Sequence, residues 1–200
     1  MKKLTLATAW LCLLIGRPVM AADEPKFIVV EQREGYELRQ YEPYLVAQTE
    51  VAGSQRGSGN QAFRLLAGYI FGNNQENQKM AMTIPVTSQL DSSASAEGDT
   101  VYQWQFVMEP QYSRQSLPTP LDQRVNIRQI PARLMAARRY SGSTSKRNFL
   151  NQLSMLESAL QRDGFRPRGE PISAVYNGPF TPGFARRNEV LIELEPSPSE

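Results

Sequence analysis

Alternation of apolar and polar residues indicates β-strands along much of the chain. It is clearest from residue 101 to 108, where Tyr102, Trp104, Phe106 and Met108 share one face and glutamines lie on the other. A two-residue period of this kind is typical of a strand with one buried face. Weaker or shorter patterns predict further strands at residues 27–30, 36–41, 44–51, 125–130, 133–140 and 189–194.

Two stretches place their apolar residues at helical spacing instead. The first is predicted over residues 60–71, after a glycine-rich turn at 54–60; Asn60 is its N-cap, and its apolar face consists of Phe63, Leu66, Ala67 and Ile70. The second is predicted over residues 146–162 and ends at Gly164; its buried stripe consists of Phe149, Leu153, Leu156 and Leu160. Proline and glycine dominate residues 167–183, and no strand is predicted there.

The order of these elements occurs twice along the chain. With an offset of 89 residues, six residues of the first half meet identical residues in the second: Arg39, Gln40, Leu45, Ala47, Gly53 and Ser54 align with Arg128, Gln129, Leu134, Ala136, Gly142 and Ser143. Each half then continues into a helix and a strand. We therefore expect two β-rich units, about residues 27–108 and 123–194, whose sheets join around a pseudo-twofold axis. The mixed order favours an α+β fold over a doubly wound sheet.

The first 21 residues have the pattern of a secretory signal peptide. Lys2 and Lys3 precede an apolar run of about 12 residues, too short for a membrane span of about 20, and a small residue stands at Ala21. We expect cleavage before Ala22 or Asp23 and a periplasmic or secreted domain over residues 22–195, with a flexible tail at 196–200. Cleavage lowers the basic count from 22 to 19 against 20 acidic residues, so the net charge gives no sign of nucleic-acid binding.

The missing residue types exclude several kinds of chemistry. The chain has no histidine, and its one cysteine, Cys12, lies in the segment that is expected to be removed. This excludes Ser-His-Asp and Cys-His nucleophiles, zinc–cysteine sites, and a histidine ligand to haem iron. Phosphate-binding loops, glycine-rich dinucleotide motifs and EF-hand loops are also missing from the sequence.

Several stretches resemble the SOUL haem-binding protein family, in the right order and at plausible spacings. They are residues 36–47, 79–86, 106–108, 125–128, 136–142, 177–182 and 186–190, and the resemblance covers residues 27–194. It implies a distorted β-barrel or curved antiparallel sheet with two helices, built from two similar halves and resembling gyrase-inhibitor-like domains. It also implies binding of haem or another tetrapyrrole, in this family usually in a surface groove beside a helix.

Candidate ligand-binding residues follow from what a porphyrin needs, which is apolar walls, cations for its carboxylates and a ligand for its iron. Around the first helix these are the apolar Phe63, Leu66 and Ile70, the cations Arg56 and Arg64, the phenol of Tyr69, and the thioethers Met80 and Met82; Arg186 and Arg187 are further cations. Each has a structural alternative. The helix stripe and the methionines can be core, and the two arginines can pair with Glu189 or Glu193.

Three functions remain open from the sequence. The first is a non-enzymatic protein that binds haem or a similar flat amphipathic molecule weakly and without histidine. The second is a small-molecule hydrolase on the same fold, with Glu and Tyr as its only acid–base groups. The third is an envelope interaction protein that has lost the ligand. We predict the first of these functions, with haem as the cofactor. The sequence predicts no metal-binding site formed by protein residues alone and no stable membrane insertion after the signal peptide is cleaved.

Overall fold

A computed structural model describes residues 23–94 and 100–195; the predicted signal peptide and tail lie outside these ranges. In the described part, one antiparallel sheet is accompanied by two helices and a short 3₁₀ helix, Gly183–Ala185. The helices are α1 (Gln55–Ile70) and α2 (Lys146–Asp163). The strands are β1 (Phe27–Arg33), β2 (Tyr36–Tyr41), β3 (Tyr44–Ala52), β4 (Val86–Leu90), β5 (Val101–Val107), β6 (Asn126–Ile130), β7 (Arg133–Tyr140), β8 (Pro167–Val175) and β9 (Asn188–Leu194).

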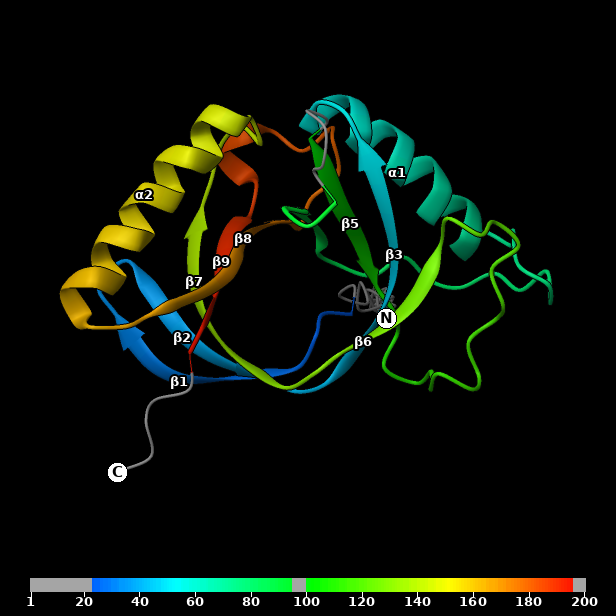
Figure 1. Cartoon of the computed structure of the whole chain (residues 1–200), viewed down its shortest axis with the longest axis horizontal. Coiled ribbons are helices and arrows are strands. Elements are labelled where there is room, and N and C mark those ends of the chain that lie inside the picture. The colour runs from blue at the N-terminus through cyan, green and yellow to red at the C-terminus, as the bar shows by residue number, and fades with distance from the viewer. Residues whose placement is uncertain (1–22, 95–99, 196–200) are drawn as a thin grey trace, which may run out of the picture.

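The strand order shows the internal symmetry. The sheet runs β1-β2-β7-β9-β8-β4-β5-β3-β6, so that β2, β3, β4 and β5 hold places equivalent to those of β6, β7, β8 and β9. Strands β2 and β6, which hold equivalent places in the two units, each pair with a strand of the other unit, since β2 pairs with β7 and β6 with β3. The sheet curls, with both helices on its outer side (Figure 1). The α+β fold with a distorted barrel and two halves is confirmed, while the exact residue limits of the two repeats stay a prediction.

Helix α1 starts five residues earlier than the sequence predicts. Ser54, not Asn60, is the N-cap, and its hydroxyl accepts a hydrogen bond from the Gly57 N–H at 3.2 Å. The sequence predicts a turn from the glycines of residues 54–60, but one of these glycines, Gly59, lies inside α1 and allows close packing. A Cβ atom at Gly59 would come within 2.8 Å of the Trp104 ring, so the helix can lie this close to β5 only with glycine there.

The second helix agrees with its prediction to within one residue. Ser145 caps the N-terminus of α2, and Gly164 ends it in the left-handed conformation with φ of 78°. Strand β8, in contrast, lies where the sequence predicts none. It pairs with β4 on one side and with β9 on the other, and its residues 172–174 are buried. The pairing on both sides therefore makes this segment a strand, although its proline and glycine content disfavours one.

Three apolar clusters divide the interior. One lies between α2 and the sheet around Leu156 and Ala136, and a second lies between α1 and the sheet around Leu66 and Ala47. The third lies on the opposite, concave face, and consists of Tyr41, Met135, Ala137, Ile172, Ala174, Tyr176 and Leu191. Neither described helix is long and apolar enough to span a bilayer. Neither α1 nor α2 covers this concave face of the sheet.

Candidate ligand site on the concave face of the sheet

Four of the predicted ligand-binding residues are core residues. Leu66, Tyr69, Ile70 and Met80 are each 6% exposed or less and pack in the cluster under α1. The Tyr69 hydroxyl donates a hydrogen bond to the carbonyl oxygen of Pro118 at 2.8 Å, and burial raises the pKa of Tyr69 to about 12. The expectation that these four side chains line a surface groove is therefore corrected: the apolar stripe of α1 faces the sheet.

The remaining candidates around α1 are exposed but are not gathered in a cleft. Phe63 is 46% exposed, and its ring meets that of Phe106 edge-on at 5.6 Å between centroids. Arg56 and Arg64 are exposed on the same helix, and Met82 lies beyond its end. None of the four lines either cleft described below.

The neighbouring residues Arg186 and Arg187 make different contacts. Arg186 donates to the carbonyl oxygens of Thr181 and Pro179, at 2.8 and 2.6 Å, and so holds its own loop. Arg187 reaches the concave face, where its Nε donates to Glu189 at 3.1 Å. The structural alternative from the sequence, an Arg187–Glu189 pair, is confirmed.

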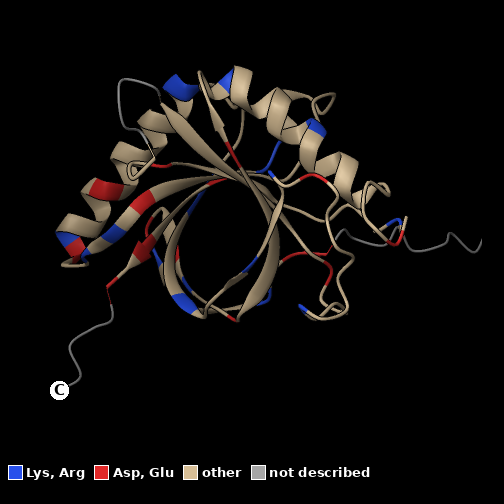
Figure 2. Ribbon diagram, turned by 45° about the vertical axis from the view of Figure 1, so that its right-hand side comes forward, with Lys and Arg blue, Asp and Glu red and all other residues tan. Residues whose placement is uncertain are grey.

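Glu189 is the centre of a buried polar network on this face. Its side chain is fully buried, and Arg39 donates to both carboxylate oxygens, at 2.8 and 3.2 Å. The Tyr176 hydroxyl donates to the same carboxylate at 2.7 Å, and the Arg187 guanidinium lies over the Tyr176 ring, 3.7 Å from its centroid. Figure 2 shows charged positions on the curled strands as well as on the helices.

The surroundings hold Glu189 in its charged form. Burial by itself would raise the pKa of Glu189, but hydrogen bonds and charge from Arg39, the Tyr176 hydroxyl and the charge of Arg187 lower it below its ordinary value. Burial, together with the nearby Glu189 charge, raises the pKa of Tyr176. Glu189 is thus an ionised acceptor and Tyr176 a neutral donor at physiological pH.

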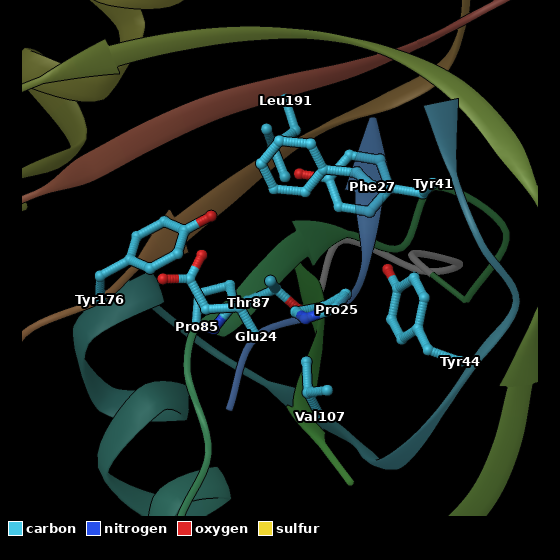
Figure 3. Close-up of a pocket in the computed structure, with 10 residues that line it drawn as sticks. All are labelled: Glu24, Pro25, Phe27, Tyr41, Tyr44, Pro85, Thr87, Val107, Tyr176 and Leu191. Atoms are coloured by element: carbon cyan, nitrogen blue, oxygen red, sulfur yellow. The ribbon is translucent and has the colours of Figure 1, made fainter. Parts of the chain in front are cut away.

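A small cavity and an open cleft lie next to each other near this network. The cavity has a volume of about 10 Å³, room for one water molecule, and is lined among others by Tyr41, Tyr176 and Leu191. Glu24 and Pro25 reach into it between Tyr176 on one side and Tyr44 on the other (Figure 3). The same two residues also line the open cleft, as do Tyr44 and Val107, so the two spaces share part of their walls.

The open cleft is large enough for a small molecule. Its volume is about 460 Å³, within the range of roughly 300–1,000 Å³ for ligand pockets. Two tyrosines, Tyr44 and Tyr112, and two cations, Lys26 and Arg114, are among its walls. Its other lining residues are Glu24, Pro25, Glu42, Pro43, Leu45, Val107, Met108, Glu109, Pro110, Ser113, Gln115 and Gln129.

Comparison with known proteins decides the family. The model of the SOUL heme-binding protein family matches residues 22–193. The chain belongs to the SOUL heme-binding protein family. Heme-binding protein 2 of Homo sapiens is 30% identical over 174 residues, which cover 84% of this chain and 82% of that protein. Heme-binding protein 1 of Xenopus tropicalis is 27% identical, covering 84% and 89%.

Solved structures share the fold of this SOUL domain. A hydrolase from Listeria innocua superposes with a TM-score of 0.60 at 8% identity, covering 83% of this chain and 94% of that one. At this identity the likeness shows the fold alone. Within the SOUL-like stretch 186–190, Arg187 and Glu189 now have a structural role, since both belong to the concave network.

Proposed function

We propose that this chain binds haem or a related tetrapyrrole in the open cleft, weakly and without histidine. The observation that carries the proposal is the cleft of about 460 Å³ with aromatic and cationic walls. A porphyrin ring can lie against the tyrosine rings, and Lys26 and Arg114 can pair with its carboxylates. Membership of a haem-binding family supports the choice of ligand.

Two phenols of the cleft are suited to face the iron. The Tyr44 hydroxyl accepts a hydrogen bond from Arg133 at 2.9 Å, and the Tyr112 hydroxyl accepts one from Gln78 at 2.9 Å. These hydrogen bonds fix the positions of the two phenol oxygens, and a tyrosine oxygen is a ligand that haem iron can take. Haem would supply a flat apolar face and two carboxylates, and the chain supplies stacking, counter-charge and partial exclusion of water.

Titration with haemin tests the proposal. We expect a Soret shift with a micromolar dissociation constant, roughly −8 kcal/mol, because apolar burial must supply most of the affinity. Tyr112→Ala removes one stacking wall and should weaken binding about tenfold. Tyr69→Phe is the control, since its hydroxyl is buried under α1 and should leave the haem spectrum unchanged.

A haem spectrum that changes in Tyr69→Phe but not in Tyr112→Ala would contradict the cleft and indicate that haem binds beside α1. No Soret shift at all at micromolar protein would favour the interaction protein that has lost its ligand.

We also propose that the protein is not an enzyme. A hydrolase would need a carboxylate with a free lone pair for a substrate or water. The most deeply buried carboxylate of the concave face, Glu189, already accepts from Arg39, Arg187 and Tyr176, and its lowered pKa makes it a weak base. The network therefore supports a structural and binding role.

The proposed location is the periplasm, after cleavage of residues 1–21. This rests on the charged start, the short apolar run and the small residue at Ala21. Intact-mass measurement of protein from the periplasmic fraction should give a chain that begins at Ala22 or Asp23. A full-length chain in the membrane fraction would contradict this.

A further inference from the structure

The segment of residues 23–26, here called the strap, occupies the mouth of the concave face. Pro25 is buried there, and the Glu24 carboxylate accepts a hydrogen bond from Nη1 of Arg187 at 2.7 Å. Figure 3 shows this carboxylate beside the Tyr176 ring, inside the group of aromatic side chains. The strap thus places a carboxylate where a ligand of the cleft would meet the polar network.

Glu24 is a replaceable partner for Arg187. Arg39 shares Glu189 with Arg187 and has Glu37 as a second carboxylate, bonded to its Nε at 2.7 Å. The second carboxylate of Arg187 is Glu24, whose side chain is 30% exposed. If Glu24 leaves, Nη1 of Arg187 loses its acceptor, and the carboxylate of a ligand can take its place with the same geometry.

The main chain of the strap is held by few contacts. The carbonyl oxygen of Asp23 accepts from the Ile84 N–H at 3.0 Å, and that of Lys26 accepts from the Glu42 N–H at 3.0 Å. The regular pairing of β1 with β2 starts only at Phe27. The strap can therefore move without breaking a strand pair.

Movement of the strap would join the two spaces. Glu24, Pro25, Tyr44 and Val107 line both the 10 Å³ cavity and the 460 Å³ cleft. With the strap displaced, the cleft extends inward to Tyr41, Tyr176 and Leu191 and ends at Arg187. The enlarged space has charged and polar walls at its mouth, aromatic walls further in, and a cation at its end.

We propose that the strap is an internal surrogate ligand, and that the site takes apolar molecules with a carboxylate, which displaces Glu24 and binds Arg187. This inference rests on the proposed function, because it names Arg187 as the partner of one carboxylate of the tetrapyrrole bound in the same cleft. Arg114, which is not on the strap, remains available to a second carboxylate at the mouth. Selection for a carboxylate follows, since only an anion replaces Glu24.

The first test compares iron-free protoporphyrin IX with its dimethyl ester by fluorescence titration. The wild type should bind the diacid more tightly than the diester. Glu24→Gln weakens the strap and should bind the diacid about fivefold more tightly, as expected for loss of a partly exposed ion pair. Glu157→Gln is the matched control, because Glu157 is exposed on α2, lines neither the cavity nor the cleft, and should leave affinity unchanged.

The second test follows the strap directly by amide hydrogen exchange. The Ile84 amide should exchange faster when protoporphyrin IX is added, and faster in free Glu24→Gln than in the free wild type. The Phe165 amide, which donates to the Leu160 carbonyl at 2.9 Å at the end of α2, is the internal reference and should not change.

The outcomes separate the two proposals. Equal affinity for diacid and diester, with unchanged Ile84 exchange, overturns the strap inference and leaves tetrapyrrole binding in place. Binding of neither porphyrin to the wild type or to Glu24→Gln overturns both. Faster Ile84 exchange together with preference for the diacid supports both.

Discussion

Replacing Arg39 by methionine should lower the free energy of unfolding by about 3–5 kcal/mol, because it leaves a buried charge without its main partner. Arg39 and Glu189 have side chains that are 5% and 0% exposed, and two hydrogen bonds join them. Arg187 and Tyr176 would remain on Glu189, but each contributes one bond. Urea denaturation followed by circular dichroism measures the change.

The internal repeat supplies a matched control. Arg128 aligns with Arg39 at the 89-residue offset, yet Arg128 is exposed. Arg128→Met should therefore change stability by no more than about 0.5 kcal/mol. The double variant Arg39→Met, Glu189→Leu should regain much of the loss, because it removes the unpaired charge. Similar losses for Arg39→Met and Arg128→Met would contradict the role of the network.

Acid should remove the same stabilisation. Because the folded pKa of Glu189 is below its ordinary value of 4.5, the folded state favours the ionised form. This contribution is fully present above about pH 4.5 and is lost as the pH falls through the folded pKa. In Arg39→Met, which lacks the main partner that lowers this pKa, the folded pKa lies closer to 4.5, so the acid-dependent loss should be smaller than in the wild type and complete at a higher pH.

The elements that the sequence predicts well are those with a local cause. Helix α2 combines a Ser145 cap, a periodic apolar stripe and Gly164, and its predicted limits match the structure. Strand β5 alternates cleanly because α1 covers one of its faces. Strand β8 could not be predicted from local sequence, because it is stabilised by pairing with β4 and β9, and β4 comes from a distant part of the chain.

The site was harder to predict than the fold because its members are far apart in sequence. Arg39 and Glu189 are 150 residues apart, and Glu24 and Arg187 are 163 apart. Alternation places Arg39 and Tyr41 on one face of β2, but it does not say which carboxylate they meet. The apolar stripe of α1 is equally consistent with core and with a groove, and burial of Leu66 and Tyr69 decides for core.

The pairing of β2 and β6 with the opposite half makes the two halves one folding unit, which Leu66→Ala and Leu156→Ala can test. Both leucines are fully buried, one under each helix. Each substitution leaves a cavity and should cost roughly 2–5 kcal/mol. Because β2 pairs with β7 and β6 with β3, neither half keeps a complete sheet alone.

We therefore expect each variant to shift a single cooperative unfolding transition, seen alike by fluorescence and by far-ultraviolet circular dichroism. Leu150→Ala and Phe63→Ala are the controls, since these side chains are 47% and 46% exposed on the same two helices. They should cost clearly less than the buried pair. Two separate transitions, with only one shifted by each buried substitution, would show that the halves unfold independently in spite of this strand pairing.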